Sequence, residues 1–298
     1  IVAELAGRSV ERAAAGGRMI IGFDHFIVLV NDLDAAIRAY RNLGFDARAG
    51  GEHPAFGSHN ALVALADGTY IELVAFKDAA LAAKTFWGAG VTKLRAGEGF
   101  GGFVLASNDL ADDVAQLKSR ALNIGDLSAG SRVRPDGQRV AWRIALCDNS
   151  PVGVLPFLIQ DETPRTLRIE PAKEGLGSRA RVKEVIVAVK ETNAARDAYR
   201  ALLGVELTRV KNVAGDVQGY RVALAWGNIV LAQPTRRGSA LADQLARRGE
   251  GLYALTLEVQ GVGRDRRELR NRGVETLNDA GGFLIAPEFA CGARIRLV

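Results

Sequence analysis

The feature that most constrains the fold of this chain is an internal repeat. Four times, the sequence runs from an apolar, strand-like segment through a polar break into an amphipathic helix and a glycine-containing turn. Further strand-like segments follow each helix, so the repeating unit is βαβββ. Four such units predict an α+β protein. The four strand–helix segments are residues 23–45, 101–125, 182–205 and 252–274.

The first unit shows the local physics of the repeat. Residues 26–30, FIVLV, are apolar and mostly β-branched, which indicates a buried strand. Asn31 and Asp32 can cap the following helix, because a short side-chain oxygen accepts hydrogen bonds from the free amides of the first turn. Gly44 suits the left-handed position after the last turn. The dipeptide at 67–68, Asp-Gly, predicts a hairpin turn between two later strands.

The four units are expected to pair into two domains. The stretch between the second and third units, residues 160–181, is polar and interrupted by proline and glycine, which is typical of a linker. The expected boundaries are an N-terminal extension at 1–21, a first domain at 22–165, a linker at 166–181 and a second, divergent domain at 182–298.

Composition excludes several classes of protein. The net charge is +5, but no block of consecutive Lys or Arg occurs, so we expect no nucleic-acid partner. No apolar run approaches the about 18 residues that a membrane-spanning helix needs. The two cysteines lie far apart in the sequence, which favours a reducing cytoplasm over a disulfide framework. The glycines at 97–103 lead into a strand instead of a helix, so we expect no nucleotide cofactor.

Four segments carry the motifs of one known family: FDHFIVLVNDLDAA (23–36), GGEHPAFGSHNALVALADGTYIELVAF (50–76), GSRVRPDG (130–137) and GVLPFLI (153–159). They resemble the glyoxalase-like domain family of the vicinal oxygen chelate (glyoxalase and extradiol dioxygenase) superfamily. The resemblance implies that two βαβββ units form a curved mixed sheet around a cup, and that four units form two such domains. It also implies lyase, isomerase or dioxygenase chemistry at one divalent metal ion, Zn, Fe, Mn or Ni, in that cup.

The resemblance carries only part of the family's ligand set to this chain. Family members take their metal ligands from the first and fourth strands of the paired units. In the first unit these positions hold His25 and Glu72. In the second unit they hold Gly102 and a residue near Phe157, and neither can bind a metal.

The residues themselves allow three roles for His25 and Glu72. Each sits in an alternating apolar strand, and a carboxylate on an apolar wall is costly unless it is paired or bound to a metal. The two side chains can form a hydrogen-bonded pair that only fixes the core, or they can be metal ligands. Without a metal, Glu72 can be a general base whose pKa is raised by its apolar wall.

The other two histidines of the chain precede the strand of Glu72. His59 is the candidate third metal ligand, which would complete a set of two histidines and one carboxylate. Alternatively, His59 and Asn60 close the loop by local hydrogen bonds. Both are also candidate substrate-binding residues. His53, next to Pro54, is expected at the rim of the cup, where it can contact a substrate.

Three arginines are candidate substrate ligands. Arg132 and Arg134 would lie near the pocket mouth in the family arrangement. Arg143 alternates with small apolar residues on a strand, which predicts that it points inward. A buried arginine requires a carboxylate or phosphate partner, which predicts an anionic substrate. The other interpretation is that they form salt bridges with surface acids. Phe157 is expected on the wall of the same pocket.

The predicted function is therefore that of a glyoxalase-like enzyme acting on a small anionic organic molecule. The alternative is a non-catalytic protein that binds or sequesters a small molecule in the same cup, which the missing ligands at Gly102 and Phe157 favour. The second domain has no histidine and is expected to serve packing or homodimerisation.

Overall fold

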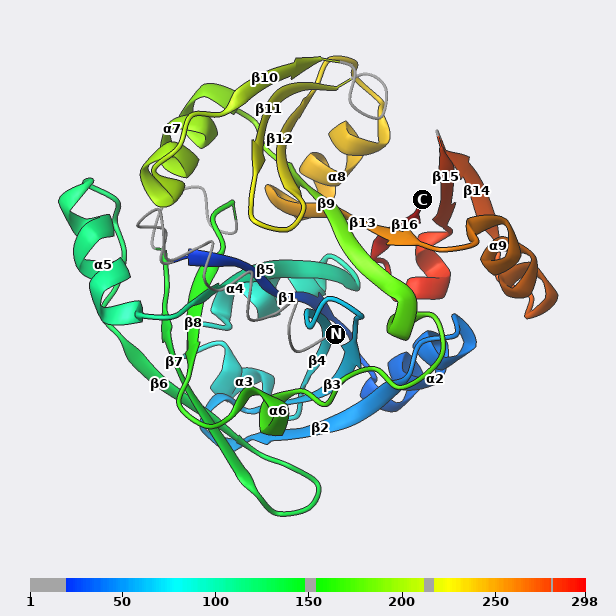
Figure 1. The fold of residues 1–298 in the computed structure, drawn as a ribbon, viewed down its shortest axis with the longest axis horizontal. Helices are drawn as coiled ribbons and strands as arrows, with labels where there is room; N and C mark the ends of the chain where they lie inside the picture. The colour runs from blue at the N-terminus through cyan, green and yellow to red at the C-terminus, as the bar shows by residue number, and fades with distance from the viewer. Residues whose placement is uncertain (1–19, 148–153, 212–216, 280) are drawn as a thin grey trace.

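The computed structural model describes residues 20–147, 154–211, 217–279 and 281–298 (Figure 1). The N-terminal extension expected at 1–21 therefore lies outside the described residues, except for Ile20 and Ile21. Two eight-stranded sheets, each made from two βαβββ units, and the helices that cover them form the protein. This is the α+β architecture that the repeat predicts.

The first two units form a closed barrel with the strand order β1-β4-β3-β2-β6-β7-β8-β5. Within each unit the first strand pairs in parallel with the fourth, and β1 joins the units by antiparallel pairing with β5. The strands are β1 (Ile20–Leu29), β2 (Ala47–His53), β3 (Ser58–Ala64), β4 (Tyr70–Phe76), β5 (Gly99–Ser107), β6 (Ser128–Val133), β7 (Arg139–Ala145) and β8 (Phe157–Asp161). The helices are α2 (Leu33–Asn42), η1 (Pro54–Phe56), α3 (Ala79–Ala82), α4 (Gly88–Arg95), α5 (Leu110–Ser119) and α6 (Arg165–Arg168).

The last two units form a second sheet with the equivalent order, β10-β11-β12-β9-β13-β16-β15-β14. In the described part of the chain this sheet stays open, with β10 and β14 at its edges. The strands are β9 (Ala180–Ala188), β10 (Thr208–Lys211), β11 (Val217–Ala223), β12 (Asn228–Pro234), β13 (Gly251–Val259), β14 (Thr276–Asp279), β15 (Gly282–Ile285) and β16 (Arg294–Leu297). The helices are η2 (Gly177–Arg179), α7 (Thr192–Leu203), α8 (Ala240–Arg248), α9 (Val262–Asn271) and η3 (Pro287–Ala290).

The barrel closes at a short seam between β2 and β6, where Glu52 pairs with Val133. Gly51 makes this close approach possible. Its φ is +136°, and a Cβ built there would lie 2.0 Å from the carbonyl oxygen of Val133. Only glycine fits, because any side chain would collide with the partner backbone.

The two faces of the barrel have different neighbours. On β1, Phe26 and Val28 point outward into the main core, which the barrel shares with the helices and the second sheet. Ile27 and Leu29 point inward, where they meet Trp142 and other side chains of the barrel interior. Strand β1 is therefore buried on both faces, which explains its continuous apolar sequence.

Local signals in the first unit are confirmed. The Asp32 side chain accepts a hydrogen bond from the amide of Ala35 (2.9 Å) and so caps α2. Gly44 has a φ of +86° after that helix, and Gly68 has a φ of +83° in the hairpin turn. The first part of the segment 130–137 belongs to a strand, since β6 runs to Val133.

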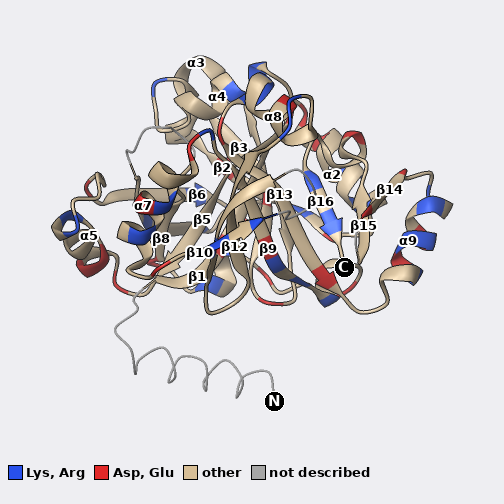
Figure 2. Ribbon diagram, turned by 90° about the horizontal axis from the view of Figure 1, so that it is seen from above, with Lys and Arg blue, Asp and Glu red and all other residues tan. Residues whose placement is uncertain are grey.

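Charges of both signs are interspersed over the molecule, for example along α5 and α9 (Figure 2). In the described part of the chain, no helix is long and apolar enough to cross a membrane.

Candidate functional site in the first barrel

His25 and Glu72 meet inside the first barrel. Strands β1 and β4 pair in parallel with Ile27 opposite Glu72, so the inward face of each strand carries one of the two side chains. His25 Nε2 lies 3.2 Å from Glu72 Oε2, and both side chains are buried. The expected contact between the first and fourth strands is thus present.

A second carboxylate holds the other side of the His25 ring. The register of β1 against β5 shifts between Phe23 and His25, and Asp24 lies in this irregularity with its Oδ1 2.6 Å from His25 Nδ1. The guanidinium of Arg168, on α6, donates to both oxygens of Asp24 (2.8 and 2.7 Å). Arg168 also donates to Asp161 at the end of β8 (3.0 Å). The histidine therefore belongs to a chain of alternating charges: Glu72, His25, Asp24, Arg168 and Asp161.

These contacts shift the pKa values of both side chains. Burial alone would raise the pKa of Glu72, but hydrogen bonds from His25 and Asn60 and the His25 charge outweigh it and lower the pKa to about 2. Burial alone would lower the pKa of His25, but hydrogen bonds to Asp24 and Glu72 outweigh it and raise the pKa. The pKa of Glu72 is thus lowered, so the prediction that its apolar wall raises it is wrong.

Asn60, and not His59, joins the pair. On β3, Asn60 points inward, and its Nδ2 donates to Glu72 Oε1 (2.6 Å). His59 is the adjacent residue on the strand, so its side chain points to the opposite face, next to Glu52 of β2 and away from Glu72. The prediction that His59 is the third metal ligand is therefore wrong.

The residues present do not fit a divalent metal ion of the kind that the family resemblance implies. The second unit presents Gly102 opposite Ile27 and the ring of Phe157 at 6.1 Å from the ring of His25. Both nitrogens of His25 already face carboxylates. Among the described residues, no group of three or more His, Cys, Asp or Glu side chains could hold a metal ion.

His53, at the end of β2, lies on the inner wall of the barrel. Its ring is 6.0 Å from that of Trp142 at an edge-on angle, and its Nδ1 lies 3.2 Å from the Ser58 hydroxyl. Burial lowers the pKa of His53 to about 4, so this histidine is neutral at pH 7. His53 was expected at the rim of the cup, but it lies inside the barrel.

The three candidate arginines have three different environments. Arg132 points into the barrel, is 3% exposed and donates through Nη2 to the carbonyl of Arg168. No carboxylate of the described residues forms an ion pair with Arg132, and its Nε has no hydrogen-bond partner. Arg134 lies at the barrel mouth. Arg143 points outward, where its Nε lies 3.3 Å from Glu162 Oε1, so the prediction that it points inward is wrong.

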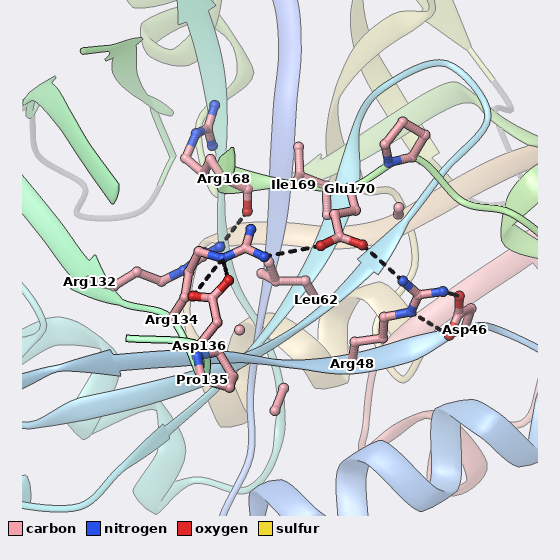
Figure 3. Close-up of a pocket in the computed structure, with 14 residues that line it drawn as sticks. Asp46, Arg48, Leu62, Arg132, Arg134, Pro135, Asp136, Arg168, Ile169 and Glu170 are labelled. Atoms are coloured by element: carbon pink, nitrogen blue, oxygen red, sulfur yellow. Dashed lines mark hydrogen bonds and ion pairs between the residues drawn. The ribbon is translucent and has the colours of Figure 1, made fainter. Parts of the chain in front are cut away.

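A cavity of about 180 Å³ opens beside Arg132, between β2, β3, β6 and the residues that follow α6 (Figure 3). Leu62 and Gly50 form part of its wall, and Arg48, Arg134 and Arg168 also border it. Sequence reasoning missed Arg48 and Arg168. No pattern marked Arg48, and Arg168 falls in the stretch interpreted as linker.

Two βαβββ units that close around a central cup define a protein of the vicinal oxygen chelate class. The family profile of the glyoxalase-like domain matches residues 23–203, more than half of the chain. The chain therefore belongs to the glyoxalase-like domain family.

Solved structures show the same fold over almost the whole chain. A hypothetical protein from Staphylococcus aureus superposes with a TM-score of 0.64 at 15% identity, over 93% of this chain and 99% of that one. A mutant of 4-hydroxymandelate synthase from Streptomyces coelicolor gives 0.63 at 13% identity, over 93% of this chain and 92% of the synthase. No curated protein is significantly similar in sequence.

Proposed function

We propose that the first barrel binds a small organic anion and that Arg132 is its anchor. The observation that supports this is the buried guanidinium of Arg132, which donates to the carbonyl of Arg168, has no hydrogen-bond partner at its Nε and forms no ion pair with a carboxylate of the described residues. A buried charge without a partner is costly, and a bound carboxylate would compensate it through two parallel hydrogen bonds. The adjoining cavity of about 180 Å³ limits the ligand to a small molecule.

In this proposal the protein is an enzyme, and His25 is its proton donor. Asp24 and Glu72 raise the pKa of His25 inside the barrel. Solvent water can take a C–H proton next to the carbonyl of a bound compound, while His25 donates a proton to the oxygen that would otherwise gain the negative charge of the enolate. Glu72 then acts as the group that holds the His25 proton, and no metal ion is required.

The second candidate is a protein that binds the anion without transforming it. The specific observation in its favour is that the His25–Glu72 pair is satisfied internally. Both ring nitrogens of His25 face carboxylates, and each oxygen of Glu72 has a partner in His25 or Asn60. A pair of this kind can serve only to hold the barrel wall. The free cysteines Cys147 and Cys291 accord with the cytoplasmic location that we propose for either function.

Binding can be tested by calorimetric titration with pentanoate, pyruvate and acetoacetate at low ionic strength. We expect the wild-type protein to bind at least one of these three anions. The Arg132→Gln variant should no longer bind that anion. Arg139→Gln is the matched control, because Arg139 is exposed and lies on the adjacent strand of the same hairpin. An affinity that is unchanged in Arg132→Gln would remove the proposal.

Catalysis can be tested by solvent exchange. NMR in D₂O measures whether the protein speeds the exchange of the C–H protons next to the carbonyl of bound pyruvate or acetoacetate. The enzyme hypothesis predicts exchange that His25→Gln abolishes while binding persists. Binding without exchange in the wild-type protein would support the second candidate.

A further inference from the structure

A single carboxylate closes the mouth of the cavity beside Arg132. After β8 the chain crosses the barrel end, and Glu170 follows α6 in this crossing segment. Its Oε1 accepts from Arg134 Nη2 (3.1 Å), and its Oε2 lies 3.2 Å from Arg48 Nη1. Figure 3 shows these contacts as one chain that links Arg134, Glu170 and Arg48. Two arginines from β2 and the β6–β7 turn therefore share one protein carboxylate.

Each of these arginines also has an acid of its own. Arg48 pairs with Asp46, and Arg134 lies 3.1 Å from Asp136. Glu170 is thus an additional carboxylate between two guanidinium groups that already have one partner each. It is also replaceable, because its side chain is 45% exposed and ion pairs of this exposure contribute little net free energy.

The interior of the same cavity presents a different arginine. Arg132 is buried and borders the cavity, with its Nε unpartnered. Arg132 and Arg134 are two residues apart, and the cavity lies between their guanidinium groups and the crossing segment (Figure 3). The guanidinium groups of Arg132 and Arg134 donate to the consecutive carbonyls of Arg168 and Leu167, and both arginines line the same small cavity. The cavity therefore has one inner and one outer anion position that a single short ligand can span.

We propose that the ligand of this site is a short dicarboxylate. One carboxylate lies on Arg132, and the second replaces Glu170 between Arg48 and Arg134. Glu170 is then an internal competitor, which the second carboxylate of a ligand displaces and which a monocarboxylate leaves in place. This proposal rests on the anion-binding function proposed above, and it adds the ligand class and the residue that selects it.

The test compares glutarate with pentanoate, which has the same chain length and one carboxylate fewer. Calorimetric titrations of the wild-type protein and Glu170→Gln are expected to show glutarate binding about tenfold tighter in the variant, while pentanoate binding changes less than about twofold. Glu162→Gln is the matched control, since Glu162 lies in the same crossing segment, is half-exposed and pairs with Arg143 away from the cavity. Neither affinity should change in this control.

Further variants separate this proposal from the function on which it rests. Arg48→Gln should weaken glutarate and spare pentanoate, whereas Arg132→Gln should weaken both. If Arg132→Gln weakens both anions but Glu170→Gln leaves their affinity ratio unchanged, the dicarboxylate proposal is overturned and the anion site remains. If no variant and no wild-type protein binds either anion, both proposals are overturned.

Discussion

At the scale of single residues, the most distinctive feature is a buried histidine that lies between two carboxylates. Asp24 and Glu72 face opposite nitrogens of the His25 ring, at 2.6 and 3.2 Å. Arg168 in turn neutralises Asp24 from the other side. Asp24 also pairs with Arg165. The removal of a partner from such a chain leaves a buried charge less well compensated, which destabilises the folded protein.

Glu72→Ala should therefore destabilise the protein strongly. It removes one partner of His25 and the acceptor of the Asn60 amide, and breaking a buried pair in this way costs roughly 3 kcal/mol. Glu72→Gln keeps one acceptor oxygen at this position and should cost less. Urea denaturation at pH 7 measures both. If Glu72→Ala lowers the free energy of unfolding by less than about 1 kcal/mol, this account is contradicted, because solvent-exposed ion pairs contribute amounts in that range.

His53 should make the protein sensitive to mild acid. Burial lowers its pKa from the ordinary 6.5 to about 4. Between these values the unfolded chain binds a proton that the folded protein does not, so stability falls as the pH decreases through this window. The free energy of unfolding should decrease by on the order of 2 kcal/mol between pH 7 and pH 5.

The control for this pH effect is His53→Gln, which cannot titrate. The free energy of unfolding should be measured for both proteins at pH 7 and pH 5. The wild-type protein should lose more than the variant by the amount attributed to His53. Parallel pH profiles of the two proteins would show that His53 titrates normally in the folded state.

The sequence predicts the centre of this site but not its surroundings. The contact between His25 and Glu72 could be predicted, because strand alternation and the family resemblance place both side chains in the cup. His59 was misplaced by one residue, which on a strand reverses the face, and Asn60 holds the position instead. The roles of Asp24 and Arg168 depend on a register shift and on a crossing segment, and neither leaves a signal in local sequence periodicity.

At the scale of elements, the seam between β2 and β6 decides whether the first sheet closes. Gly51→Ala would place a Cβ 2.0 Å from the Val133 carbonyl oxygen at a φ of +136°. We expect a cost of roughly 2–4 kcal/mol, because both the backbone conformation and the contact become unfavourable. Hydrogen exchange measured on Gly51→Ala and on the wild-type protein should show that the substitution speeds the exchange of the β2 and β6 amides more than that of the β1 amides.

Gly68→Ala is the control for backbone strain alone. Gly68 also has a positive φ, but a Cβ there meets nothing within 4 Å. It should cost only about 1 kcal/mol and leave the exchange of β2 and β6 unchanged. Equal effects of the two substitutions would mean that the close approach at Gly51 does not matter for closure.

The helices and the strands with long apolar runs could be predicted, whereas the second strand of each unit could not. Strand β2, at residues 47–53, contains two glycines and three charged or histidine side chains, so no alternation marks it. Its position comes from pairing with β3 and β6. On β7 the small residues beside Arg143 suggested an inward face, but the bulky Trp142 and Ile144 face inward.

At the scale of the whole molecule, Arg248 of α8 connects the second sheet to the first barrel. Its guanidinium donates to the carbonyls of Lys93, Gly97, Glu98 and Phe100 at the end of α4 and the start of β5. Arg248→Met should cost about 2 kcal/mol, because it leaves partly buried carbonyls without donors. Arg247→Met, on the exposed side of the same helix, should change stability by less than about 0.5 kcal/mol.

Calorimetric unfolding checks this prediction and shows how the two halves are coupled. A single transition that shifts downward in Arg248→Met alone would confirm that the contact stabilises the assembled molecule. The same melting temperature in both variants would mean that the Arg248 contacts contribute nothing to the union of the two halves.

The repeat in the sequence predicts two equivalent sheets, and the pairing of the units is confirmed for both. It does not predict that one sheet closes and the other stays open. That difference depends on a contact between the second strands of two units, made through Gly51 in the first barrel. Contacts of this kind lie far apart in the sequence, and composition does not mark them.

The buried Arg168 also determines where this chain can be divided. A fragment ending at Asp161 would contain all eight strands of the first barrel, yet its Asp24 would lack the guanidinium that neutralises it. We therefore expect a fragment that folds independently to extend through α6, because this helix supplies both arginines that pair with Asp24. A fragment that ends at the last strand would retain the contact of Asp24 with His25 but would lose both arginines.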